Sequence, residues 1–211
     1  MALEHLVGCN QAMFRARPGG ACWGISIEFC KHALDTGDAV QAIYEMFDRI
    51  SSVARKAESH MQAQQLKVHD VARPMYVRDE LGNIDANIEN LSGRLTQNTA
   101  IQVRHNVITE MMVGNGIKNI GTLSSYYEGG TGPLIETLIL LSKKAGNAAT
   151  LFDLQQPLGH TVVLHYSGEG LHFFDPNDGL WRVDLSTAVA DLVERFMPYT
   201  FTFGHLLVKK N

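Results

Sequence analysis

The sequence predicts an α+β fold, with a helical N-terminal half packed on a small antiparallel sheet. Between residues 21 and 65, apolar residues recur every three or four positions, which is typical of helices. After residue 148 they form short or alternating runs separated by turns rich in Gly, Pro and Asp, which is typical of antiparallel strands. Helices early in the chain and strands late in it favour α+β over a doubly wound α/β architecture.

Two helices are expected in the first third of the chain. Residues 1–20 should form a loop that ends in the turn Arg17-Pro18-Gly19-Gly20. The first helix then spans Ala21 to Leu34. The second spans Ala39 to Gln65, with Asp38 as its N-cap and one apolar face opposite one charged face.

The middle of the chain carries a weaker pattern. Glycines and a proline divide Lys67 to Gly129 into short pieces, of which Ala100 to Met112 most resembles a helix. A further helix is expected from Thr131 to Lys144, since Pro133 lies just inside its start and Gly146 just past its end.

The last third should contain a meander of strands with one helix before the final strand. The expected strands are Ala149–Leu154, Thr161–Tyr166, Leu171–Phe174, Leu180–Val183 and Tyr199–Val208, and the expected helix is Ser186–Phe196. No linker or internal repeat divides the sequence, so we expect residues 1–211 to form a single domain.

Composition excludes several classes of protein. The 211 residues include 18 Lys and Arg and 22 Asp and Glu, for a formal net charge of -4, and no basic run exceeds two residues. We therefore expect no nucleic-acid partner. The longest nearly uncharged apolar stretch, Gly132 to Leu141, is far shorter than the roughly 20 residues that cross a bilayer, so no membrane span is expected.

Neither a disulfide framework nor a metal site is expected. The three cysteines are irregularly spaced and form no CxxC motif: Cys9, Cys22 and Cys30. Six of the nine histidines lack a partner at ligand spacing: His5, His32, His60, His69, His105 and His205. The usual zinc-protease, nucleotide, calcium and serine-hydrolase motifs are absent. Residues 1–10 lack the basic and apolar regions of a Sec signal. A chain of this size can bury a sufficient core without a cofactor, so none is expected.

Cys22 is the candidate nucleophile. It follows a Gly-Gly turn and lies in the first turn of the first expected helix, where free amide groups and the helix dipole favour a thiolate. Cysteine is also a common small core residue, so the position by itself leaves both interpretations open.

His160 and Asp175 flank an expected hairpin and should share one face of it. A two-residue loop at Ser167-Gly168 places them directly opposite each other, and a loop at Gly168-Glu169 makes them diagonal neighbours. The alternative is a strand-end histidine near an unrelated Asp-Pro turn. Strand alternation puts His165 and His172 on the other face, where we expect exposed sheet residues.

Three segments of the sequence resemble one known family. They are Gly20-Ala21-Cys22-Trp23-Gly24-Ile25-Ser26, Gly159-His160-Thr161-Val162-Val163-Leu164 and His172-Phe173-Phe174-Asp175-Pro176-Asn177-Asp178-Gly179. The chain resembles the YopT-like, or AvrPphB-like, family of bacterial effector cysteine proteases. The resemblance implies a papain-like fold with Cys22 as nucleophile, His160 as general base and then acid, and Asp175 as the carboxylate that orients the imidazole.

The resemblance also implies how the oxyanion is bound. The backbone N–H of Cys22 would be one donor, and an upstream side-chain amide the other. Gln11 is our choice for it, with Asn10 as the other amide and Arg17 nearer in sequence.

The family context implies a protein substrate in a host or competitor and leaves room for a cognate chaperone or inhibitor. It further implies synthesis in the bacterial cytoplasm and secretion by a specialised system into the cytosol of a target cell. Cys22 lies nearer the first residue than is usual for the family, so a processed form, an isolated catalytic domain and a relative delivered by another route all stay open. So do glutamine deamidation or transglutamination, peptidoglycan amide hydrolysis and an inactive binding module.

Overall fold

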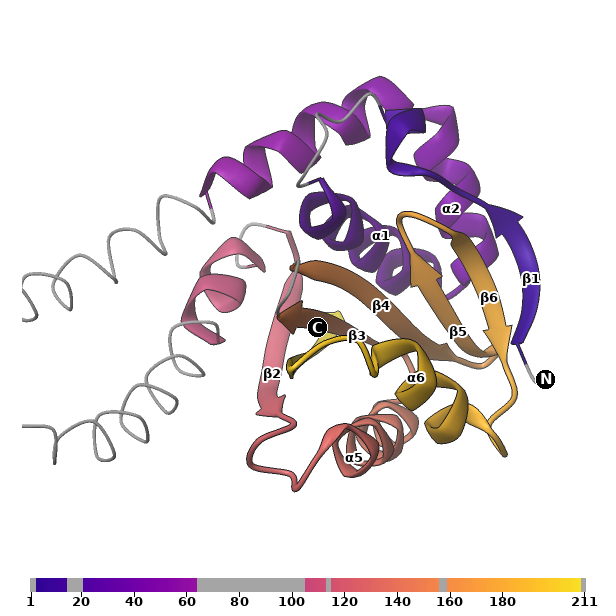
Figure 1. Cartoon of the computed structure of the whole chain (residues 1–211). Coiled ribbons are helices and arrows are strands. Elements are labelled where there is room, and N and C mark those ends of the chain that lie inside the picture. The colour runs from indigo at the N-terminus through magenta and orange to yellow at the C-terminus, as the bar shows by residue number, and fades with distance from the viewer. Residues whose placement is uncertain (1–2, 15–20, 64–104, 113–114, 156–158, 210–211) are drawn as a thin grey trace, which may run out of the picture.

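A seven-stranded antiparallel sheet forms the centre of the molecule. The computed structural model describes residues 3–14, 21–63, 105–112, 115–155 and 159–209. Within this part of the chain, the strand order in the sheet is β1-β6-β5-β4-β3-β7-β2 (Figure 1). The four consecutive strands β3 to β6 form the expected meander, and β7 crosses over to pair with β3.

The element bounds are as follows. The strands are β1 (Leu3–Gly8), β2 (Ile117–Ser124), β3 (Ala148–Gln155), β4 (His160–Ser167), β5 (Gly170–Asp175), β6 (Gly179–Val183) and β7 (Phe201–Lys209). The helices are the short 3-10 helix η1 (Gln11–Phe14) and α1 (Cys22–Thr36), α2 (Ala39–Asp48), α5 (Thr131–Ala145) and α6 (Ala188–Phe196). Residues 50–63 and 105–112 are also helical.

Helices cover both faces of the sheet, as Figure 1 shows. Helices α1 and α2, together with helical residues 50–63 and 105–112, pack on one face around a cluster that includes Val163 and Phe174. Helices α5 and α6 pack on the other face around a cluster that includes Val162 and Phe173. Successive residues of each strand therefore belong to opposite cores, as the two-residue period of a strand requires.

Most expected elements are confirmed within a few residues. Helix α1 ends at Gly37, whose φ of 71° is a left-handed conformation that glycine adopts without strain. The Asp38 carboxylate accepts hydrogen bonds from the backbone N–H groups of Val40 and Gln41, which confirms it as the N-cap of α2. The α+β class is confirmed as well.

Two expectations were wrong, and one strand was not predicted. Residues 3–8 form strand β1 and not a loop, because they pair with β6 at the sheet edge. Strand β2 was not predicted, since a bulge between Asn119 and Gly121 interrupts its pattern. The helix expected from Ala39 to Gln65 breaks at Arg49, whose N–H donates to the carbonyls of Met46 and Phe47. The break contains neither Gly nor Pro, so packing and not local sequence produces it. Residues 64–104 lie outside the described part.

Candidate active site

Cys22 is the first residue of α1, as the sequence predicts. Its side chain is largely buried, and the preceding Ala21 supplies no capping side chain for the helix. The first amide groups of α1 therefore keep their hydrogen-bonding capacity, and the positive end of the helix dipole lies at the sulfur.

Two contacts hold the first turns of α1 against neighbouring elements. A Cβ atom on Gly24 would lie 2.2 Å from the carbonyl oxygen of Ala57, so only glycine permits the close approach of the helix at residues 50–63. The buried hydroxyl of Ser26 donates to the backbone oxygen of Thr161 at 3.0 Å. This bond ties α1, one turn after Cys22, to the residue beside His160.

A buried carboxylate adds to the attachment of α1. Glu28 accepts hydrogen bonds from His60 at 2.7 Å and from Lys31 at 2.8 Å. Burial by itself would raise the pKa of Glu28, but these two bonds outweigh it and lower the pKa to about 2. The carboxylate is therefore ionised at neutral pH and links α1 to the helix at residues 50–63.

His160 and Asp175 form a close pair at the ends of two neighbouring strands. His160 is the first residue of β4 and Asp175 the last of β5. The imidazole Nε2–H donates to the carboxylate Oδ1 at 2.9 Å. Val163 pairs with Phe174, which is the register with the loop at Gly168-Glu169, so His160 and Asp175 are diagonal neighbours on one face.

Cys22 lies close enough to the imidazole to influence its protonation. Because Nε2 is engaged with Asp175, Nδ1 is the ring nitrogen that remains for another partner. Burial lowers the pKa of His160, but its interactions with Asp175 and then with Cys22 outweigh burial and raise the pKa to about 9. The imidazole is thus a cation at neutral pH.

The turn that carries Asp175 is held on two sides. Within the turn, Asn177 N–H donates to Asp175 Oδ1 at 2.8 Å. From η1, Gln11 Nε2 donates to Asn177 Oδ1 at 2.6 Å. From α6, Arg195 donates to Asp178 Oδ2 at 3.3 Å.

The two amides proposed as oxyanion donors lie beside this turn. The side-chain oxygen of Asn10 accepts a hydrogen bond from Ala12 N–H. The Gln11 amide is engaged with Asn177. Arg17 lies outside the described residues.

The other two cysteines have different surroundings. Both are buried free thiols. Burial and then the charge of Asp175 raise the pKa of Cys9 to about 12, and burial raises the pKa of Cys30 strongly. Cys22 is instead the thiol that influences the protonation of an imidazole, that of His160.

The expectation for the two remaining hairpin histidines was wrong. His165 and His172 do lie on the opposite face from His160, but both are buried. They pair directly across the strands, under the helices that cover this face. The strand period predicts which face of the hairpin His165 and His172 share. Nothing in the local sequence indicates that helices cover that face.

Tyr199 is a residue at this site that sequence analysis did not single out. Its ring stacks against the imidazole of His160 with the centroids 6.4 Å apart. It was placed only as the first residue of the final strand, and nothing in the local pattern indicates contact with β4.

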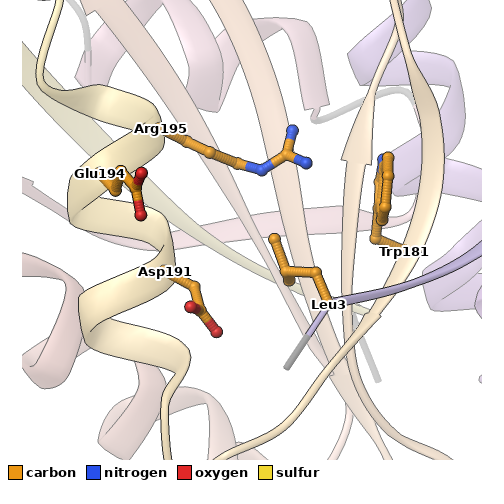
Figure 2. A pocket seen from close by; sticks show the side chains of 5 residues that line it. All are labelled: Leu3, Trp181, Asp191, Glu194 and Arg195. Carbon is orange, nitrogen blue, oxygen red and sulfur yellow. The ribbon is translucent and has the colours of Figure 1, made fainter. Parts of the chain in front are cut away.

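A separate cavity of about 430 Å³ lies between α6, β6 and β1. Figure 2 shows its lining by Leu3, Trp181, Asp191, Glu194 and Arg195, with the Arg195 side chain reaching toward Trp181. The guanidinium carbon lies 4.8 Å from the Trp181 ring centroid. None of Cys22, His160 and Asp175 lines this cavity.

The described residues contain no group of three or more His, Cys, Asp or Glu side chains arranged to hold a metal ion. In the same part of the chain, no helix has the length and apolar character needed to cross a membrane.

Comparisons with known proteins support the fold. No family model matches the sequence, and no curated protein matches it. The structure is similar to the crystal structure of the Pseudomonas avirulence protein AvrPphB, with a TM-score of 0.59 over 96% of each chain and 15% sequence identity. The chain therefore shares its α+β fold with AvrPphB along nearly its whole length.

Proposed function

We propose that this chain is a cysteine endopeptidase with a papain-like fold, in which residues 1–211 form one catalytic domain. The observation that carries the proposal is the hydrogen bond between His160 and Asp175, beside a Cys22 that influences the same imidazole. A thiol at a helix start, an imidazole and an orienting carboxylate are the parts that nucleophilic acyl transfer requires. The fold shared with AvrPphB, a member of the family that the sequence motifs resemble, supports the same conclusion.

The reaction proceeds in two halves. The Cys22 thiolate attacks the scissile carbonyl carbon, and the tetrahedral intermediate collapses as His160 gives its proton to the leaving amine nitrogen. The amine product departs and a thioester remains on Cys22. His160, now neutral, takes a proton from water as the water attacks the thioester, which releases the carboxylic acid and restores the thiolate and imidazolium.

Asp175 accepts a hydrogen bond from Nε2 of His160 and so keeps Nδ1 directed at the sulfur and the leaving nitrogen. The oxyanion is bound by the Cys22 backbone N–H and by a second donor, for which Gln11 is our choice and Asn10 the other candidate. Because the Gln11 amide donates to Asn177, it serves this role by turning one N–H toward the substrate.

The substrate is a protein of a host or competitor cell, and the chain acts as a bacterial effector secreted by a specialised system. A cognate chaperone or inhibitor is a further proposed partner. These assignments rest on the family resemblance together with the fold shared with AvrPphB.

The pH dependence of Cys22 alkylation tests the proposal. Iodoacetamide labelling is followed by mass spectrometry from pH 5 to 9 in the wild type and in His160→Ala, with the urea-unfolded chain as reference. At pH 6 we expect Cys22 of the folded wild type to label on the order of a hundredfold faster than in the variant, because the imidazolium maintains the thiolate. Equal rates in both proteins would overturn the imidazole–thiol pair.

A proteome-derived peptide library then identifies the reaction. New peptide termini that appear with the wild type and not with Cys22→Ala support endopeptidase activity. Conversion of glutamine to glutamate without new termini would overturn it in favour of deamidation. Cys22→Ala should keep its fold, since a small residue at a helix start costs little stability.

A further inference from the structure

The loop between β2 and α5 presents two adjacent aromatic side chains to solvent. Tyr126 and Tyr127 are 50% and 47% exposed, and their rings meet edge to face with the centroids 5.3 Å apart. Of the exposed large apolar side chains in the described part of the chain, three are aromatic, and only these two are neighbours. An exposed aromatic pair is typical of a binding surface, because tyrosine supplies a large contact area at a low cost in conformational entropy.

Hydrogen bonds hold the backbone of this loop in place. The Tyr127 N–H donates to the Ser124 carbonyl at 3.1 Å. The Gly130 N–H donates to the Ser125 carbonyl at 2.6 Å. Ser125 is also bonded to β7 in both directions, since its N–H donates to the Thr202 carbonyl at 2.9 Å and its hydroxyl accepts from the Thr202 N–H at 3.2 Å. The backbone that carries the two rings is therefore ordered before a partner binds, which lowers the entropy cost of binding.

The loop lies at the same end of the sheet as His160, the proposed general base. His160 pairs with Leu154 in β3, and Leu154 pairs in turn with Thr202 in β7. Thr202 is bonded to Ser125, the last residue before the two tyrosines. Three steps of about 5 Å between neighbouring Cα atoms give a separation of about 15 Å from His160 to Ser125. Figure 1 shows β2 ending at the loop that leads into α5.

A substrate polypeptide that crosses these strand ends therefore meets the loop. An extended chain rises about 3.3 Å per residue, so a span of about 15 to 20 Å corresponds to about five or six residues. Neutral aromatic rings that are half exposed gain most from contact with another apolar side chain.

We propose that Tyr126 and Tyr127 form a docking surface for the substrate protein, which takes a large aliphatic or aromatic side chain about five or six residues from the scissile bond. The loop is tied to the sheet that carries His160, so a side chain bound there sets the position of the substrate along the strand ends. This surface gives the enzyme a preference beyond the residues next to the bond that is cut. The inference rests on the proposed function, since it extends the same substrate site.

The length of the substrate tests this surface. A peptide that the library shows to be cleaved is made in two forms, a short one with three residues and a long one with eight residues on each side of the scissile bond. The variant is the double substitution Tyr126→Ser and Tyr127→Ser. The matched control is Tyr44→Ser, because Tyr44 is a 55% exposed tyrosine on α2. All three side chains lie at the surface, so the variants should keep their fold.

In the wild type and in Tyr44→Ser we expect the long peptide to have a KM about tenfold lower than the short one at the same kcat, because a remote contact stabilises ground state and transition state equally. In the double variant the two peptides should have equal KM values. Replacing the outer residues of the long peptide by Ser, one at a time, should identify one apolar residue whose loss raises KM in the wild type and not in the double variant. Iodoacetamide labelling of Cys22 should be the same in all three proteins.

Equal KM values for the two peptides in the wild type, or the same advantage of the long peptide in the double variant, would overturn the inference while leaving the proposed function intact. The serine scan on the wild type decides the matter even if the double variant fails to fold, since a charged outer residue, or none, as the source of the advantage would also overturn it. A change in the oligomeric state of the double variant, measured by sedimentation, would assign the rings to a contact between copies of the chain, and the inference is then wrong. If no library peptide is cleaved, or if His160→Ala labels Cys22 like the wild type, the proposed function fails and the inference falls with it.

Discussion

One hairpin, β4–β5, carries two pairs of residues that contain histidine and have opposite properties. At its open end, His160 bonds to the Asp175 carboxylate, and its pKa is raised to about 9. In its middle, His165 lies across from His172, and burial is the main cause that lowers the pKa of His165 to about 4. Among the described residues, no carboxylate is bonded to either ring. The two pairs use the same strands and differ in partner and in solvent access.

The comparison shows that burial alone does not set the charge of a histidine. Both His160 and His165 lose solvation, yet only His160 gains a carboxylate acceptor. The His165 Nε2–H donates to the neutral amide oxygen of Asn147, and its buried Nδ1 has no hydrogen-bond partner in the described part of the chain. The open-end pair suits proton transfer, whereas the buried pair suits a neutral ring in a core.

Removing the Asp175 carboxylate should reduce activity more than any other change. It leaves His160 without a carboxylate acceptor, as His165 is. In Asp175→Asn we expect peptide cleavage to fall by about a thousandfold or more, since the amide favours the wrong imidazole tautomer. The pKa of His160 should fall as well, which moves fast Cys22 labelling to higher pH.

The matched control is Asp178→Asn in the same turn, which removes the carboxylate that faces Arg195 and should keep most activity. Cleavage rates on peptides identified from the library are compared among the three proteins. Full activity in Asp175→Asn would remove Asp175 from the mechanism.

Replacing the buried histidine should change stability and not reactivity. The unfolded chain binds a proton on His165 below about pH 6.5, whereas the folded chain binds it only below about pH 4, so this residue destabilises the fold as pH falls. Between pH 7.5 and 5 the loss is about 2 kcal/mol. In His165→Gln, urea unfolding should show that this loss is absent.

His160 titrates in the opposite sense, because its raised pKa gives stability that is lost as pH rises through about 9, and this contribution is common to both proteins. His5→Gln, which replaces an exposed histidine on β1, serves as the control and should keep the wild-type slope. An unchanged slope in His165→Gln would contradict the assignment.

Loosening the link between α1 and β4 should have the smallest effect. Ser26→Ala removes a buried hydrogen bond to Thr161, which should cost about 1 kcal/mol of unfolding free energy and slow Cys22 labelling at pH 6 a few-fold. The control is Ser142→Ala. Ser142 is a buried serine of α5, on the opposite face of the sheet from α1, so this variant should lose comparable stability with no change in Cys22 labelling. Equal labelling in both variants would show that the Ser26 bond does not position the thiol.

The relation between His160 and Asp175 could be predicted because it depends only on a short turn and the period of a strand. The burial of His165 could not be predicted in this way. It depends on helices that the chain brings over the sheet from far away in sequence.

Strand β1, at the edge of the sheet, could not be predicted for a related reason. Strand β1 alternates poorly, with Glu4 and His5 both exposed, and becomes a strand through its pairing with β6. The motif that includes Gly24 and Ser26 could be seen in the sequence, but its reason is tertiary. Gly24 admits the backbone of Ala57, and Ser26 reaches the backbone of Thr161.

The Ser26–Thr161 bond joins positions 135 residues apart. During synthesis, α1 therefore leaves the ribosome long before the strand that carries His160, and Cys22 spends that interval without its imidazole. Pairing between such distant segments forms late in folding, since the intervening chain must first be closed into a loop. The proposed reactive centre therefore forms only after β4 has been made, and Cys22 labelling can report when α1 and β4 come together.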